Sequence, residues 1–304
     1  FLGLCSHEYF HSWLVKRIQP QELVQPDLHQ ENYTELLWVF EGFTSYYDDL
    51  LLARAGIITP QEYLDLLAQT ITRHLRTPGR FHQSVTESSF DAWTKYYKQD
   101  ENTPNSVVSY YVKGALVALC TDLKLRQLSK QHYSLDHVMR ALWQDYGKTG
   151  RGVGKDTVQQ LCQHLVADDL SAFWQQCLYS TEELPLTELL QSQGVSVQYK
   201  YESGKSQALA TLGVRGQAAE GGFQVQNVWR GGAAEAAGIS AGDVIIAADG
   251  LKVGAQLEKT IASYAIGDTL DLYFFRRDEL MQRQVKLQAG AQDSCVLQLG
   301  LEVQ

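Results

Sequence analysis

The stretch His7-Glu8-Tyr9-Phe10-His11 has the pattern H-E-x-x-H. On a helix, residues four positions apart lie on one face, so both imidazoles can reach a single metal ion. Glu8 then lies beside the ion rather than among its ligands, where its carboxylate can take a proton from a bound water. The pattern predicts that His7 and His11 are ligands of a catalytic zinc ion and that Glu8 is the general base.

A third ligand is needed, because a catalytic zinc ion takes three protein ligands and keeps one position open. Glu41 follows the apolar run at 36–40 and precedes Gly42. A buried carboxylate needs a cationic partner, which zinc would provide. Glu31 and Glu35 are rival ligands in a more polar stretch. A surface position for Glu41, or a core ion pair, is the alternative interpretation.

Two tyrosines, Tyr110 and Tyr111, begin the sequence Y-Y-V-K-G downstream. A phenol hydroxyl near the metal can donate a hydrogen bond to a developing oxyanion. Spacing alone does not separate this role from packing, since an aromatic pair at a helix start is more often part of a core.

Residues 1 to about 195 show mainly helical periodicity. Thr59-Pro60-Gln61-Glu62 matches a capping box with proline at the first helical position, which predicts a helix start. Residues 77–105 are rich in loop-forming types and predict a long loop. Further helices are predicted over 38–52, 106–125, 134–147, 158–166 and 172–178.

From about residue 205 glycine becomes frequent, and alternating runs predict strands. These runs cover 223–228, 244–245 and 270–275, with short helices predicted at 233–237 and 257–261. The sequence therefore predicts an α+β protein with two domains, 1–200 and 206–304. Residues 201–207 are the predicted linker.

Composition excludes several function classes. The net charge is −9 and no run is rich in lysine or arginine, which argues against a nucleic-acid partner held by phosphate contacts. No apolar run approaches the ~18–20 residues of a membrane helix. Five irregularly spaced cysteines without C-x-x-C argue against a zinc ribbon and predict a reducing, cytoplasmic location.

Other candidate residues are interpreted as structural. The histidines without ligand spacing, predicted to be surface or core residues, are His29, His74, His82, His132, His137 and His164. Three aromatic residues in the predicted loop, Trp93, Tyr96 and Tyr97, are predicted to pack, and a place in the lining of a substrate pocket is the alternative. The chain has no G-x-S-x-G and no Walker loop, so serine-hydrolase and nucleotide-driven chemistry have no support.

In combination, these motifs resemble a known family. H-E-x-x-H, then W-V-F-E-G-F at 38–43 and Y-x-K-G at 111–114, resemble the gluzincin aminopeptidases. The longer strings at 7–13, 41–49 and 109–114 resemble the glycyl aminopeptidase family more closely, whose members end in a PDZ domain. The resemblance implies a mostly helical, thermolysin-like catalytic domain followed by a PDZ-like β domain.

The same resemblance implies roles for individual residues. One zinc ion per chain is expected on His7, His11 and Glu41, with Glu8 as the base. Tyr111 is expected to stabilise the tetrahedral intermediate, with Tyr110 as the fallback. Ser45, one turn after Glu41, is predicted to orient a zinc ligand. Leu14 stands where the family is expected to have an asparagine.

In that family a sheet precedes the H-E-x-x-H helix, and its G-x-M-E-N-like edge holds the substrate's free amine. No such segment precedes residue 7, so we expect an N-terminally truncated fragment that lacks the sheet. The predicted function is removal of N-terminal residues, glycine or alanine among them, from peptides. The alternatives are a zinc endopeptidase and an inactive peptide-binding PDZ adaptor.

Leu212-Gly213-Val214 is the best match to the peptide-binding loop of a PDZ domain. In that fold, backbone amides hold a peptide C-terminus while the ligand adds as a strand to the sheet edge. A peptide C-terminus is therefore a predicted partner besides peptide substrates. The alternative is a PDZ-like domain that packs on the catalytic domain and binds nothing in trans.

Overall fold

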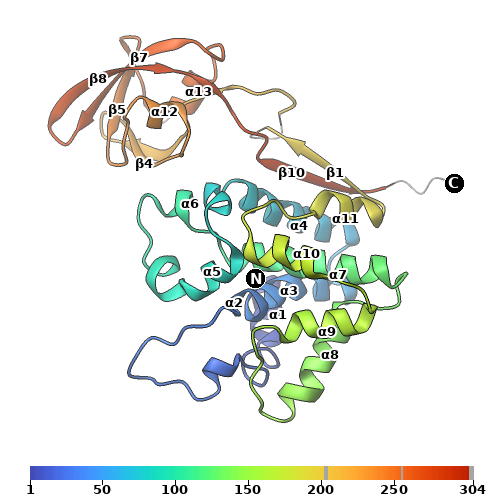
Figure 1. Cartoon of the computed structure of the whole chain (residues 1–304). Coiled ribbons are helices and arrows are strands. Elements are labelled where there is room, and N and C mark those ends of the chain that lie inside the picture. The colour runs from blue at the N-terminus through green and yellow to red at the C-terminus, as the bar shows by residue number, and fades with distance from the viewer. Residues whose placement is uncertain (202–204, 255, 301–304) are drawn as a thin grey trace.

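The structure, a computed structural model, describes residues 1–201, 205–254 and 256–300. A helical domain forms the larger part of the molecule, and a β domain lies against one side of it (Figure 1). Each domain has its own hydrophobic core. The predicted α+β, two-domain fold class is confirmed.

The helical domain is arranged around one buried helix, α7. α7 spans Val112–Leu128, and most of its residues are buried, as in a helix surrounded by others. The helices are α1 (Leu2–Phe10), α2 (Leu37–Phe40), α3 (Gly42–Arg54), α4 (Pro60–Leu75), α5 (Val85–Phe90), α6 (Thr103–Ser106), α7, α8 (Leu135–Leu142), α9 (Thr157–Val166), α10 (Ser171–Trp174) and α11 (Leu186–Ser192).

Local capping explains where several of these helices begin. Thr59 and Glu62 form the predicted capping box at the start of α4. Ser84 and Glu87 form a second capping box that starts α5. The long loop predicted at 77–105 is therefore wrong, since this segment holds α5, α6 and the turns η2 (Pro78–Phe81) and η3 (Ala92–Tyr96).

The helix predicted from residue 106 begins later, at Val112. Val107 has an extended backbone, with φ −119 and ψ 138. The Val108 N–H donates to the side-chain oxygen of Gln83 at 3.0 Å, which satisfies a buried donor outside any helix. The extended residues lead directly into the Tyr110–Tyr111 pair.

The β domain contains a six-stranded antiparallel sheet with the order β3-β4-β5-β7-β8, and β6 pairs with β5. Leu270, Leu272 and Phe274 alternate into its core along β7, which is the period of a half-buried strand. Its elements are β2 (Ala210–Thr211), β3 (Val214–Ala219), β4 (Gly222–Val228), α12 (Ala233–Ala236), β5 (Val244–Ala248), β6 (Leu251–Lys252), α13 (Leu257–Ile261), β7 (Thr269–Arg276), β8 (Glu279–Lys286) and β9 (Gln288–Ala289).

A two-stranded sheet joins the domains. β1 (Val195–Lys200) pairs antiparallel with β10 (Ser294–Leu299). β10 lies along α4, where its Cys295 N–H donates to the Thr72 hydroxyl at 2.9 Å. The domain limits 1–200 and 206–304 stay a prediction. β10, which lies inside the second predicted range, packs with the helical core rather than with the β domain. Residues 202–204 of the predicted linker lie outside the described residues.

A turn of the β domain also contacts the helical domain directly. The Asn105 amide donates to the Val228 carbonyl at 2.7 Å and accepts from the Arg230 N–H at 3.0 Å. Asn227 donates a further hydrogen bond to the Glu101 carbonyl at 2.9 Å.

Among the described helices, none has the length and apolar character needed to cross a bilayer.

Candidate metal centre

The H-E-x-x-H stretch lies on α1, where His7 and His11 share one face. Their ring centroids are 4.7 Å apart and the rings are nearly perpendicular. Glu41, between α2 and α3, places its Oε2 3.5 Å from His7 Nε2 and 3.3 Å from His11 Nε2. Two segments about thirty residues apart thus bring the three predicted ligand residues together.

The donor set fits zinc. One ligand atom from each of His7, His11 and Glu41 lies within 4.8 Å of the others, and all three residues are half-buried. Two imidazole nitrogens and one carboxylate oxygen are a ligand set of catalytic zinc ions. The rival ligands lie elsewhere: Glu35 pairs with Lys155 at 3.2 Å, and the carboxylate of Glu31 accepts from the Tyr33 hydroxyl.

The electrostatics of the three residues favour a cation. Hydrogen bonds to Asp48 and then to Glu41 raise the pKa of His7 to about 9. Burial raises the pKa of Glu41, but hydrogen bonds to His11 and His7 outweigh it and lower this pKa to about 2. The His7 imidazole therefore holds its proton beside a carboxylate, in the position where a metal cation would compete with that proton.

Asp48 is a residue that the sequence analysis missed. Its Oδ2 lies 3.2 Å from His7 Nδ1, and its carbonyl accepts from the Ser6 hydroxyl at 2.8 Å. Ser45, the residue predicted to orient a ligand, donates its backbone N–H to the Glu41 carbonyl at 2.8 Å, at the start of α3. Asp48 follows Glu41 by seven positions, a spacing that keeps both on one helix face and could have identified it.

Two glycines explain why α3 and α7 approach so closely. A Cβ added to Gly42 would lie 2.5 Å from backbone atoms of Gly114, and one added to Gly114 would lie 2.9 Å from the Cα of Gly42. Real Cβ atoms do not approach backbone so closely. Gly42 follows Glu41 and Gly114 follows Tyr111 by three positions, so this contact brings the ligand and the tyrosine to one site.

Tyr111 and Glu8 line the same open pocket as the three ligand residues. Tyr110, the fallback residue, is 1% exposed and lies in the core. The interpretation of Tyr97 as packing is wrong, because its side chain is 65% exposed and its hydroxyl lies 3.4 Å from that of Tyr111. No local sequence signal marks this contact, since it depends on how η3 packs against α7.

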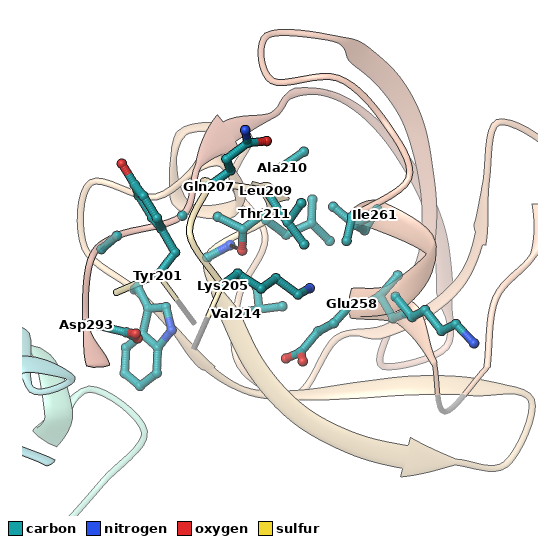
Figure 2. Close-up of a pocket in the computed structure, with 18 residues that line it drawn as sticks. Tyr201, Lys205, Gln207, Leu209, Ala210, Thr211, Val214, Glu258, Ile261 and Asp293 are labelled. Atoms are coloured by element: carbon teal, nitrogen blue, oxygen red, sulfur yellow. Dashed lines mark hydrogen bonds between the residues drawn. The ribbon is translucent and has the colours of Figure 1, made fainter. Parts of the chain in front are cut away.

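The predicted PDZ loop lines a pocket of about 380 Å³ in the β domain. Gly213 has a positive φ of 74°, which favours glycine in this loop. Its carbonyl accepts from the Trp229 N–H at 2.8 Å. Figure 2 shows Tyr201 and Lys205 on one side of the pocket and Glu258 and Ile261 of α13 on the other.

Comparisons with known proteins agree with this architecture. Residues 1–117 match the family model of the M61 glycyl aminopeptidases, and residues 210–287 match that of the PDZ domain. No curated protein matches. Two solved structures are only weakly similar: the HtrA-type protease AlgW with a decapeptide and the serine endoprotease from Yersinia pestis. Their identities are 22% and 21%, their TM-scores 0.26 and 0.25, and the alignments cover 29% and 27% of this chain and 31% and 29% of theirs.

A much stronger likeness covers almost the whole chain. An aminopeptidase N family protein from Idiomarina loihiensis is 44% identical, with a TM-score of 0.92. The alignment covers 99% of this chain and 53% of that one, so this chain spans about half the length of the solved relative. The chain belongs to the M61 glycyl aminopeptidase family, with a PDZ domain following its peptidase region.

Proposed function

We propose that this protein is a zinc-dependent aminopeptidase that removes N-terminal residues from peptides. The observation that carries the proposal is the convergence of His7, His11 and Glu41, whose ligand atoms lie within 4.8 Å of one another. Glu8 and Tyr111 line the same pocket, so a base and a hydrogen-bond donor lie beside the ligands. Membership of the M61 family supports the same chemistry.

The residues of the pocket have complementary roles. Bound by His7, His11 and Glu41, zinc supplies Lewis-acid polarisation of the scissile carbonyl and of the attacking water. The Glu8 carboxylate accepts a proton from that water and passes it to the leaving amine. The Tyr111 hydroxyl donates a hydrogen bond to the oxygen on which negative charge develops.

The choice of an aminopeptidase, and of N-terminal glycine or alanine, rests on the family. The PDZ domain of this chain supports a second peptide site. We propose that the pocket between β3 and α13 holds a peptide C-terminus. That pocket combines a glycine loop with apolar side chains beside the edge strand β3, which is the arrangement needed for strand addition.

Elemental analysis and a peptidase assay, both on the full-length protein that contains this chain, together test the proposal. We expect about one zinc ion per wild-type chain, as for other catalytic sites, and loss of the ion in Glu41→Gln and His11→Ala. Glu8→Gln should keep the ion and lose hydrolysis of glycyl- and alanyl-p-nitroanilide. Zinc retained in both ligand variants would contradict the metal site.

Blocked substrates separate the two peptidase alternatives. An aminopeptidase should cleave glycyl-p-nitroanilide and spare its N-acetylated form, because the free amine is part of what it binds. Equal cleavage of both forms would instead indicate an endopeptidase. Full zinc binding without cleavage of either substrate would favour the inactive PDZ adaptor.

A further inference from the structure

We propose that Tyr97 is a positioning residue of the peptidase site, which holds the Tyr111 hydroxyl so that its proton points into the metal pocket. The inference rests on the proposed function. It assigns a role to a hydroxyl that was not among the site residues predicted from the sequence. Tyr97 follows η3, fourteen positions before Tyr111, and approaches it through the fold rather than through a motif.

Three phenol hydroxyls form a continuous chain. The Tyr110 hydroxyl donates to the Tyr97 hydroxyl at 3.3 Å, and the Tyr97 hydroxyl lies 3.4 Å from that of Tyr111. The Tyr110 and Tyr111 rings stack with centroids 4.8 Å apart, and Tyr96 packs on Tyr110 at 4.7 Å. The buried Tyr110 thus provides a fixed starting point for the chain.

The direction of the chain follows from what a hydroxyl can do. Each phenol has one proton to donate and an oxygen that can accept. Because Tyr97 accepts from Tyr110, its own proton is available for the Tyr111 oxygen. Tyr111 then keeps its proton for the pocket that it shares with Glu8 and Glu41. Donors in such a chain polarise one another, which strengthens the last one.

The exposure of Tyr97 argues against a role in core packing. Its side chain is 65% exposed, whereas Tyr110 is 1% exposed. An exposed side chain loses rotamer entropy when its hydroxyl is held in one place. The hydrogen bonds of Tyr97 with the Tyr110 and Tyr111 hydroxyls must offset that loss. The neighbouring Tyr96 offers a matched control, because its hydroxyl contacts Ser109 at 3.2 Å instead of Tyr111.

Steady-state kinetics on the zinc-loaded full-length protein test the inference. For glycyl-p-nitroanilide we expect Tyr97→Phe to lower kcat about 5- to 10-fold, the effect of one hydrogen bond, with KM unchanged. Tyr111→Phe should lower kcat by about 10²- to 10³-fold, as for loss of an oxyanion donor. Tyr96→Phe should behave like wild type, and zinc content and melting temperature should stay constant in Tyr97→Phe.

A double-mutant cycle shows whether Tyr97 acts through Tyr111. In the Tyr111→Phe background, adding Tyr97→Phe should have no further effect on kcat, because the hydroxyl it positions is gone. Equal losses in both backgrounds, or full activity of Tyr97→Phe, would overturn the inference and leave the proposed function intact. A zinc-loaded wild type without hydrolysis would overturn the proposed function itself, and the inference with it.

Discussion

Asp48 shows how a single side chain can determine the quality of a metal site. Its carboxylate contacts His7 Nδ1 at 3.2 Å, which leaves Nε2 to face Glu41. Ligand imidazoles generally need such a partner to fix their orientation and tautomer. Removal of the partner should therefore weaken metal binding even though all three ligand residues remain.

We predict that Asp48→Ala lowers zinc affinity about 10- to 100-fold, the usual effect of losing an outer partner of a ligand histidine. Competition with a chromogenic chelator measures the affinity directly. Asp49→Ala is the control, because Asp49 is a half-buried carboxyl on the same helix whose backbone, not its side chain, contacts Asp48. Equal losses in the two variants would show that local charge matters rather than the contact with His7.

His74 is a second residue whose environment has a measurable consequence. It is 3% exposed in α4, and its Nδ1 has no hydrogen-bond partner in the described part of the chain. Burial, and then the nearby charges of Lys113 and Arg80, lower its pKa to about 3. The half-exposed Glu183 places its Oε2 4.0 Å from His74 Nε2, and its Oε1 pairs with Arg80 at 3.0 Å.

The lowered pKa predicts a loss of stability in acid. The pKa of a histidine in the unfolded chain is about 6.5, so below that pH His74 binds a proton in the unfolded chain but not in the folded one. The free energy of unfolding is therefore highest above that pH and falls as the pH drops toward 3. For one proton, the free energy of unfolding changes by at most about 1.4 kcal/mol per pH unit. Urea unfolding of His74→Leu at pH 7 and pH 5 should show a smaller pH effect than wild type. The exposed His29→Leu should not.

At the scale of elements, the crossing of α3 and α7 is the arrangement on which the site depends. Gly42 and Gly114 meet there without side chains, and the next residues toward the pocket are Glu41 and Tyr111. A side chain at either glycine would push the helices apart. The relative positions of the ligand and the tyrosine would change with them.

We predict that Gly114→Ala lowers the free energy of unfolding by about 1–3 kcal/mol through overpacking. The added Cβ would lie 2.8 Å from the Trp38 carbonyl oxygen, which belongs to backbone that cannot move away cheaply. Peptidase activity of the folded variant should fall as well. Gly254→Ala has open space around the new methyl and should change neither quantity. Unaltered stability of Gly114→Ala would contradict the close contact.

Elements also show which parts of the fold the sequence could predict. The capping box at Thr59 and the strands of the β domain were predictable, because their signals are local. The fold between 77 and 105 was not, since short helices there depend on contacts such as that between Gln83 and Val108. The three ligand residues carry a motif, whereas Asp48 and Tyr97 are defined only by tertiary contacts.

At the scale of the whole molecule, the chain leaves the helical domain, forms the β domain and returns. β10 pairs with β1 and buries Leu297, which is 1% exposed, in the helical core. Gln61 of α4 donates to the Leu297 carbonyl at 3.1 Å. The stability of the helical domain should thus depend on residues that follow the β domain in sequence.

We predict that Leu297→Ala destabilises the helical domain by about 2–5 kcal/mol, the cost of a cavity at a buried leucine. Hydrogen exchange resolved by segment should show faster exchange in α4 and unchanged protection in β7. Val285→Ala, at a buried position of the β domain, should show the opposite pattern. Loss of protection in β7 alone after Leu297→Ala would contradict the assignment of β10 to the helical core.

The return of β10 also fixes an order of events during synthesis. The strand partner of residues 195–200 lies at 294–299, so a ribosome must translate the entire β domain before that pair can form. At ~5–20 residues per second, β1 waits roughly 5 to 20 seconds for its partner. During that interval α4 lacks the strand that covers it, and the β domain can fold first. A nascent chain stalled before β10 would therefore expose a surface that chaperones recognise.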